Sequence, residues 1–233
     1  MAGRIWIIDT ARTLALAGMV VFHLCFDLQM YGHLPPGTTQ APALFWLARI
    51  VAGGFLFLAG ASLWLGHGNG IRWQAFWQRW LRIAAAAALV SLATRIAMPQ
   101  AWVFYGILHS IAVASLLGLA FLRLPAMLTL GTGAGIMAAS YHLPQILQWN
   151  APALRWLGLA NIPTQTVDFE PVFPWLGPFL LGLGTARLLG RHWPALARIT
   201  GPNWLAWPGR HSLAIYLLHQ PILLGAIWLL SFL

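Results

Sequence analysis

The sequence predicts an all-α protein, a polytopic transmembrane helix bundle of about seven spans with the N-terminus in the cytoplasm and the C-terminus outside. Of its 233 residues, 60% are hydrophobic and only 7% are charged. A soluble domain carries about 25% charged residues. So few charges cannot form a water-soluble surface, and we therefore expect the chain to lie in the lipid bilayer. The length suits a single transmembrane domain over residues 1–233.

Seven apolar stretches are long enough to cross a bilayer, which takes roughly 20 apolar residues. They cover about residues 5–30, 43–66, 77–98, 102–122, 124–142, 172–190 and 209–232. The first is expected to be a retained helix and not a cleaved signal peptide, because it is long and carries Asp9 and Arg12. The longest connection, 143–171, is expected outside. Its part 145–160 fits either an amphipathic interfacial segment or a plain connector.

The basic residues set the predicted orientation. The formal net charge is +9, and all 13 basic residues are Arg. With the N-terminus in the cytoplasm, only Arg95 and Arg155 fall outside, as the positive-inside rule requires. The cytoplasmic set is Arg4, Arg72, Arg79, Arg82, Arg123, Arg187, Arg191, Arg198 and Arg210. This arrangement explains the positive charge better than nucleic-acid binding does, so we expect no nucleic-acid partner.

One face of the first span carries ionisable side chains at costly depths. Successive members of this face are three or four residues apart and so lie on the same side of a helix: Asp9, Arg12, Leu16, Met19, His23 and Asp27. Each charge costs at least about 2.5–3.5 kcal/mol at the bilayer centre, so this face must meet protein or a water-filled cavity. We interpret Asp9 with Arg12 as a structural ion pair and His23 with Asp27 as a functional pair.

Other spans carry polar residues at a similar depth. Arg49 in the second span is a candidate counter-ion for Asp27. His109 in the fourth span and His219 in the last can join His23 around one central cavity. For His109 and for His219 a plain hydrogen bond to neighbouring backbone is an equally good interpretation.

A histidine beside a carboxylate is a competent general base. It can take the proton of an amine or hydroxyl that attacks an acyl group. An acyl donor on a phosphorylated carrier would need cationic side chains at its entrance. The candidates are Arg12, Arg79, Arg82, Arg187, Arg191 and Arg210, although positive-inside topology explains the same residues. No metal is expected in this chemistry.

Five segments resemble, in order along the chain, motifs of the heparan-alpha-glucosaminide N-acetyltransferase-like membrane family. They are IDTARTLALAGMVVFHLCFDL (8–28), GGFLFLAGASLWL (53–65), GILHSIAVA (106–114), DFEPVFPWLGPFLLG (168–182) and GRHSLAIYLLHQP (209–221). The resemblance implies transfer of an acetyl or other acyl group from cytosolic acyl-CoA, the co-substrate, to an extracytoplasmic amino sugar or other glycan. It also implies a short bacterial form in the cytoplasmic (inner) membrane, with a homodimer among the states that fit.

The resemblance also points to particular residues. It matches His23 to a polar active-site position of the family and His33 to the neighbourhood of the catalytic histidine of the lysosomal members. Together with Asp27, Arg49, His109 and His219 these form the candidate catalytic set. Thr13 stands where the family usually has Gly, and no segment of this sequence corresponds to the large lumenal domain of the lysosomal enzymes.

Two other classes of protein stay open. A proton-coupled transporter or exporter would use intramembrane His and Asp as relays, although no internal inverted repeat is visible. A haem-binding electron carrier would ligate iron through His23 and His109, or through His109 and His219.

Overall fold

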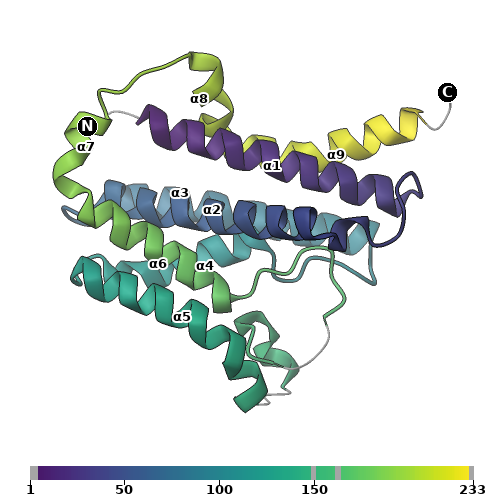
Figure 1. Cartoon of the computed structure of the whole chain (residues 1–233), viewed down its shortest axis with the longest axis horizontal. Coiled ribbons are helices and arrows are strands. Elements are labelled where there is room, and N and C mark those ends of the chain that lie inside the picture. The colour runs from purple at the N-terminus through teal and green to yellow at the C-terminus, as the bar shows by residue number, and fades with distance from the viewer. Residues whose placement is uncertain (1–4, 148–150, 161–163, 231–233) are drawn as a thin grey trace. The chain divides into compact units, whose positions relative to one another are not determined.

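A computed structural model describes residues 5–147, 151–160 and 164–230 as helices joined by turns and loops (Figure 1). The α-helices are α1 Trp6–Met30, α2 Pro42–His67, α3 Trp73–Ala97, α4 Ile107–Phe121, α5 Ala126–Leu147, α6 Val172–Leu188, α7 Trp193–Leu196, α8 Asn203–Arg210 and α9 Ser212–Leu230. Short 3₁₀ helices cover Thr38–Gln40, Pro152–Leu157 and Gly190–His192. These residues form no strand, and an isolated parallel bridge joins Tyr105 to Phe169. The all-α class is therefore confirmed for the part of the chain that the structure describes.

Several helices are suited to crossing a membrane. Helices α1, α2, α3 and α9 are long and apolar enough, and α6 with the segment Gly190–Leu196 makes a fifth if this pair, bent by 61°, counts as one span. Helix α4 and the part Ala126–Ser140 of α5 are shorter apolar helices. The chain is thus a multi-pass membrane protein, whereas seven spans and the orientation of the termini stay predictions.

Some predicted boundaries were wrong. The span expected from residue 102 begins only at Ile107, because the preceding segment pairs with a distant loop. There, the Val167 N–H donates to the Ala101 carbonyl and the Glu170 N–H to the Tyr105 carbonyl. The span expected over 209–232 is divided at His211 between α8 and α9. The loop expected from residue 143 starts later, because α5 continues to residue 147.

One compact unit, here the terminal unit, consists of Met1–Phe55 and His192–Leu233. Within it α1 packs along both α8 and α9, as Figure 1 shows. The approach of α8 is close, because a Cβ at Gly209 would overlap the carbonyl oxygen of Asp9. Two segments nearly 200 residues apart in sequence therefore form one packed layer. Their backbones can come this close because Gly209 has no side chain.

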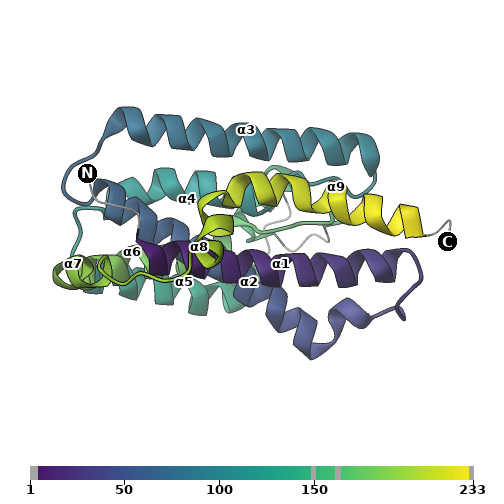
Figure 2. The same cartoon turned by 90° about the horizontal axis from the view of Figure 1, so that it is seen from above.

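The other compact unit, here the central unit, is Leu56–Arg191. Helix α5 packs along α6, and α4 contacts both α6 and α3; the pairing of α3 with α4 is visible in Figure 2. Phe179, Leu180 and Leu183 on α6 are fully buried. A Cβ at Gly60 would overlap the Phe179 carbonyl oxygen. Gly60 therefore permits the close approach of α2 to α6.

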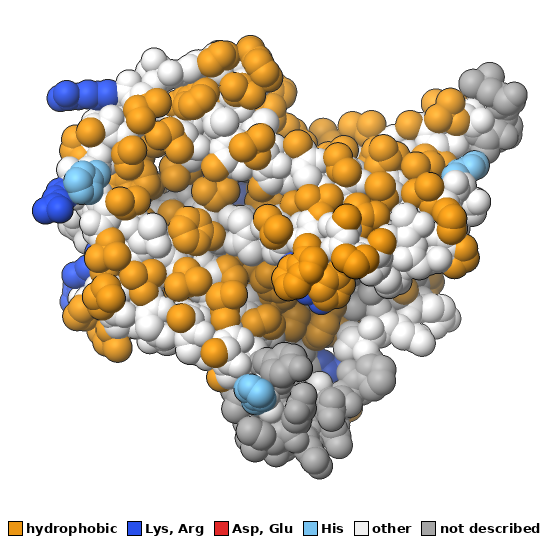
Figure 3. Space-filling view, in the orientation of Figure 1, with side chains coloured by type: hydrophobic (Ala, Val, Ile, Leu, Met, Phe, Trp, Pro, Cys, Tyr) orange, Lys and Arg blue, Asp and Glu red, His pale blue; other side chains and the backbone are white. Residues whose placement is uncertain are grey.

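Large apolar side chains are exposed along the long helices. On α3, Leu81, Leu89, Leu92 and Ile96 are each more than half exposed. Figure 3 shows hydrophobic side chains over much of the visible face. A water-soluble monomer rarely exposes so much contiguous apolar surface. Contact with lipid accounts for it.

The packing of Gly60 yields a stability prediction. Gly60→Ala should lower the free energy of unfolding by about 1–3 kcal/mol, the usual cost of overpacking, because the new methyl group meets backbone that cannot rotate away. Gly54→Ala on the same helix is the matched control, since a Cβ there meets nothing within 4 Å. Thermal unfolding in detergent micelles measures both variants. Equal melting temperatures would contradict the close approach.

Candidate functional site

Polar side chains of α1 and α9 meet inside the terminal unit. The rings of His23 and His219 pack with their centroids 4.8 Å apart. The Gln220 Nε2 donates a hydrogen bond to Asp27 Oδ1 over 2.7 Å. Asp27 is completely buried and His219 is only 9% exposed. The ionisable face predicted for the first span therefore meets His219 of the last predicted span, and we call His23, Asp27, His219 and Gln220 the α1–α9 polar cluster.

The partner of Asp27 differs from the expected one. Neither His23 nor Arg49 pairs with this carboxylate in the described residues; Gln220 does. The Arg49 guanidinium lies 3.5 Å above the ring of Phe45, one turn earlier on its own helix. An amide can satisfy a buried carboxylate without bringing a second charge into the interior, which explains the choice of partner. The predicted pairing of Asp27 with Arg49 is wrong.

Within the part of the chain that the structure describes, three buried atoms of the cluster have no hydrogen-bond partner: Asp27 Oδ2, Gln220 Oε1 and His219 Nε2. Gln220 Oε1 can only accept a hydrogen bond, because the Gln220 amide nitrogen already faces Asp27, and Asp27 Oδ2 can only accept while the carboxyl group is ionised. The His219 Nδ1 contacts the Tyr216 carbonyl oxygen, which can only accept, so Nδ1 carries the proton and the neutral ring has its lone pair on Nε2. With Asp27 ionised, these three atoms are acceptors that face no donor in the described residues. Each buried unpaired acceptor costs about 1–3 kcal/mol, and such a set fits a ligand rich in N–H or O–H groups.

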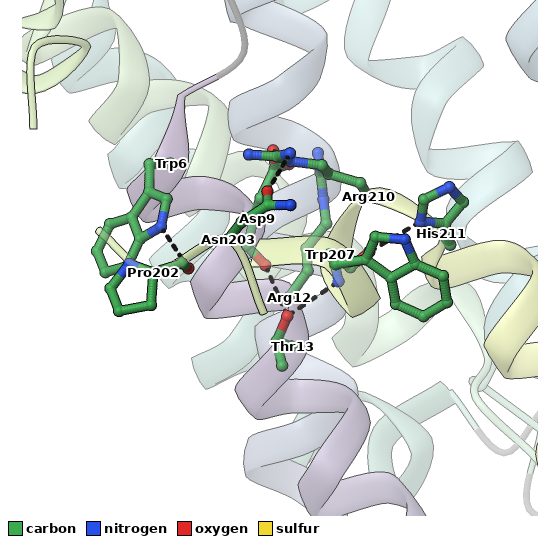
Figure 4. Close-up of polar contacts among 10 residues, drawn as sticks. Trp6, Asp9, Arg12, Thr13, Pro202, Asn203, Trp207, Arg210 and His211 are labelled. Atoms are coloured by element: carbon green, nitrogen blue, oxygen red, sulfur yellow. Dashed lines mark hydrogen bonds and ion pairs between the residues drawn. The ribbon is translucent and has the colours of Figure 1, made fainter. Parts of the chain in front are cut away.

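A second polar cluster joins α1 to α8 in the same unit (Figure 4). Asp9 is 4% exposed. Its Oδ1 lies 3.1 Å from Arg12 Nη1 and its Oδ2 lies 3.3 Å from Arg210 Nε. Arg210 also donates to Asn203 Oδ1 over 2.7 Å. The predicted pair of Asp9 with Arg12 is confirmed, and the structure adds Arg210, which no local spacing in the sequence could reveal.

Thr13, the residue that departs from the family pattern, has a definite place here. Its hydroxyl donates to the Asp9 carbonyl oxygen and accepts from the Gly209 N–H. Figure 4 shows this hydroxyl between the two helices. The side chain therefore bridges α1 and α8, a bond that glycine at position 13 could not make.

The Arg residues predicted to bind phosphate belong to both units. Arg12 and Arg210 share the Asp9 carboxylate in the terminal unit. In the central unit, Arg187 donates to the Leu122 carbonyl oxygen at the end of α4, and Arg82 donates to Gln78 of its own helix. The remaining two, Arg79 and Arg191, also lie in the central unit. Phosphate binding by these six residues stays a prediction.

His109, in the central unit, uses both ring nitrogens. Its Nδ1 faces the Gly106 N–H at 3.2 Å, so the proton of the neutral ring is on Nε2, which faces Ser91 Oγ at 3.3 Å. The Ser91 hydroxyl donates to the Val103 carbonyl oxygen. This arrangement supports the plain structural interpretation, in which His109 caps the start of α4.

His33 has a different setting from the other histidines. It lies in the turn that follows α1, and its side chain is exposed. Its backbone N–H donates to the Leu28 carbonyl oxygen, which closes the turn. In the described residues no side-chain partner orients this ring, so the structure supplies nothing that prepares it as a base.

Asp168 holds the start of α4 from a distant loop. Its Oδ2 accepts from the Ile107 N–H over 3.1 Å, and Gly106 lies directly against the carboxyl group. Burial raises the pKa of this carboxyl from its ordinary 3.8 to about 6, against the opposing effect of the Ile107 hydrogen bond. Burial also raises the pKa of neighbouring Tyr105, whose ring packs between those of His109 and Trp156. The sequence indicated an acidic aromatic segment here but gave no sign of the helix that it caps.

These observations define a multi-pass helical membrane protein with a histidine-containing polar cluster between its first and last long helices. The family model of the heparan-alpha-glucosaminide N-acetyltransferase catalytic domain matches residues 4–221. The chain belongs to this family, as the five sequence motifs indicated. Searches of curated proteins and of solved structures returned no match. Family membership implies a membrane N-acetyltransferase, with acetyl-CoA as the acetyl donor.

The Asp9 cluster yields a prediction. Asp9→Asn keeps the shape of the side chain but leaves two guanidinium groups without their shared anion, so we expect the free energy of unfolding to fall by about 1–3 kcal/mol. Arg12→Gln should cost less, because Arg210 still balances Asp9. Chemical denaturation in micelles compares the two variants. A larger loss in Arg12→Gln than in Asp9→Asn would contradict the central role of the carboxylate.

Asp168 yields a pH prediction. Its raised pKa means that folding favours the protonated form, so its contribution to stability is complete below about pH 4 and is lost as pH rises through about 6. Asp168→Asn keeps an acceptor for the Ile107 N–H but cannot ionise. Melting temperatures measured between pH 4 and pH 7 should therefore fall by a few degrees more in the wild type than in Asp168→Asn. If the melting temperatures of the wild type and of Asp168→Asn fall equally with pH, Asp168 does not have the raised pKa assigned to it.

Proposed function

We propose that this protein transfers an acetyl or other acyl group from cytosolic acyl-CoA to an extracytoplasmic acceptor, an amino sugar or another glycan. The proposed location is the bacterial cytoplasmic (inner) membrane. The acyl acceptor reacts at the α1–α9 polar cluster, where an imidazole of the His23–His219 pair is the general base. Family membership supports the class of reaction, and the resemblance of the first helix favours His23 as the base.

The observation that carries this proposal is the set of unpartnered acceptors in the cluster. Asp27 Oδ2, Gln220 Oε1 and His219 Nε2 are buried together on two packed helices and face no donor in the described residues. A protonated or neutral amine, or a sugar with several hydroxyl groups, brings the donors that these atoms lack. The buried carboxylate also favours a cationic group over a neutral one.

The proposed acyl transfer needs only the acceptor, the thioester and one imidazole of the cluster. The acceptor nitrogen or oxygen attacks the thioester carbonyl carbon, a new bond to the acyl carbon forms, and the bond between that carbon and sulfur breaks. The proton of the attacking group passes to the imidazole, and the departing thiolate takes it from the imidazolium. A positioned base of this kind contributes about 10²–10⁴-fold to the rate.

The donor needs cationic contacts for its phosphates. Arg12 and Arg210 together bring two positive charges against the one negative charge of Asp9, so their cluster keeps a net positive charge. Each of these side chains is about one quarter exposed, which leaves guanidinium surface for an anionic ligand. We assign the phosphates of acyl-CoA to this end of α1, with the Arg residues of the central unit as further candidates.

The two alternative functions gain no such support. Of the histidine pairs considered for haem, both include His109, whose two ring nitrogens already have partners. A proton-coupled transporter would move its substrate unchanged. Substrate flux in liposomes without any acylated product would favour the transporter over the enzyme.

The proposal predicts the effect of removing His23. His23→Ala should abolish acyl-CoA-dependent modification, with a loss of about 10²–10⁴-fold, because it removes one imidazole of the pair and the ring that packs against the other. The purified full-length protein in nanodiscs is assayed with acetyl-CoA and a panel of amino sugars, with mass spectrometry of the product.

The control is the folded state of the variant, measured by its elution volume and melting temperature. His33→Ala is assayed in parallel, because the resemblance offers this residue as the second candidate. Unchanged turnover in a folded His23→Ala variant would overturn the role of His23 as the base and leave His219 as the remaining imidazole of the pair. Loss in His33→Ala alone would move the base to the turn after α1.

A further inference from the structure

The two histidines of the α1–α9 polar cluster differ in how their rings are held. The His219 Nδ1 donates to the Tyr216 carbonyl oxygen three residues earlier on α9. Its Nε2 is buried and has no hydrogen-bond partner among the described residues. His23 packs its ring against Phe22 and against His219, and in the described residues no hydrogen bond fixes which of its nitrogens carries the proton.

This difference matters for proton transfer. A general base must present a lone pair in a fixed direction, and enzymes achieve this with a third group that holds the other ring nitrogen. A backbone carbonyl is such a group and cannot change its role, because it only accepts hydrogen bonds. His219 therefore has the fixed tautomer and the free lone pair that a base needs, and His23 has neither in the described contacts.

His109 shows what a structural histidine looks like in the same protein. Its two nitrogens face the Gly106 N–H and the Ser91 hydroxyl, so no lone pair is left for a substrate. In His219, by contrast, Nε2 has no hydrogen-bond partner in the described part of the chain. Buried polar atoms in native proteins are nearly always paired, and an exception calls for an explanation such as a catalytic role or a ligand.

We infer that His219 is the general base of the site and that its Nε2 is the atom that takes the proton from the attacking acceptor group. The inference rests on the proposed acyl transfer and specifies it. As the bond from the acceptor to the acyl carbon forms, the N–H or O–H proton moves to Nε2, and the imidazolium keeps its bond to the Tyr216 carbonyl oxygen. The sulfur of the thioester leaves with the electron pair of the broken bond and takes the proton back from Nε2.

The neighbours of His219 fit this role. On α1, the His23 ring packs against it, and Asp27 is held by Gln220, the next residue after His219. On α9, the Tyr216 ring lies 5.6 Å away, centroid to centroid. Asp27 is the carboxylate of the cluster, and its hydrogen bond with Gln220 fixes its orientation. Gln220 is therefore a positioning residue, and it is not among the catalytic candidates that the sequence indicated.

Two substitutions at position 219 separate the atoms involved. His219→Asn places an amide N–H near the position of Nδ1, so it can keep the bond to the Tyr216 carbonyl oxygen, but it has no atom at Nε2. His219→Gln places a polar atom near Nε2 that cannot accept a proton at neutral pH. Both variants are expected to fold. If Nε2 is the base, both lose at least about 100-fold in kcat, with a much smaller change in KM.

The dependence of kcat/KM on pH then identifies the base. The ionisation that limits the rate on the acidic side should disappear in His219→Gln and should persist in His23→Gln, whatever the remaining rate of the second variant. A merely structural role for His219 would lower the rate and leave the shape of this profile unchanged. Retention of the acidic limb in His219→Gln would overturn the inference.

A measurement without substrate tests the tautomer. The full-length protein is labelled with ¹⁵N-histidine in micelles, and the signals that disappear in His219→Asn are assigned to position 219. We expect a protonated Nδ1 and an unprotonated Nε2 above the titration range. A protonated Nε2 with a free Nδ1 would contradict the inference even if the enzyme is active.

The outcomes distinguish this inference from the proposed function. If the wild type shows no turnover with any acyl-CoA and amino sugar, the proposed function fails and the role of His219 fails with it. If the wild type turns over and His219→Gln keeps its rate or its acidic limb, the function stands and only the assignment of His219 falls.

Discussion

The buried carboxylate of Asp9 is the constraint on which the terminal unit depends. It lies one turn into α1 and binds Arg12 on the same helix and Arg210 at the end of α8. Thr13 and Gly209 bring the two backbones together at the same level. Because α9 starts two residues after Arg210, this contact also sets where α9 begins relative to α1. The α1–α9 polar cluster lies further along α1 and α9. The contact between α1 and α8 therefore determines which residues of α9 face His23 and Asp27.

The same alignment determines the chemistry available to the cluster. Asp27 and His23 are one turn apart on α1, and His219 and Gln220 are adjacent on α9. The sequence suggested that His23 and Asp27 act together as a pair. The structure couples residues across the helices instead, with Asp27 to Gln220 and His23 to His219. A carboxylate and an imidazole on neighbouring turns need not meet when each finds a partner on the facing helix.

The three histidines predicted to lie inside the membrane show how far residue type alone can lead. The sequence favoured a functional role for His23, because Asp27 lies one turn away, and left His109 and His219 open to a plain structural role. In the structure, the surroundings of the ring nitrogens differ. His109 makes hydrogen-bond contacts through both ring nitrogens and His219 through one. The described contacts of His23 are ring-packing contacts. The available lone pair, which is the property that catalysis uses, depends on atoms up to 18 residues away in sequence.

The sequence by itself determined the lipid environment, the all-α class and the family. It also determined which face of α1 is polar, because apolar content and helical periodicity are local properties that need no knowledge of the fold. The Asp9–Arg12 pair is local in the same sense and was found correctly. Only the tertiary structure decided that Arg210 completes this pair, that Gln220 and not Arg49 holds Asp27, and that the last predicted span is two helices. The first two features depend on contacts between residues roughly 200 positions apart. Hydropathy and spacing carry no information about which distant side chain will be the partner.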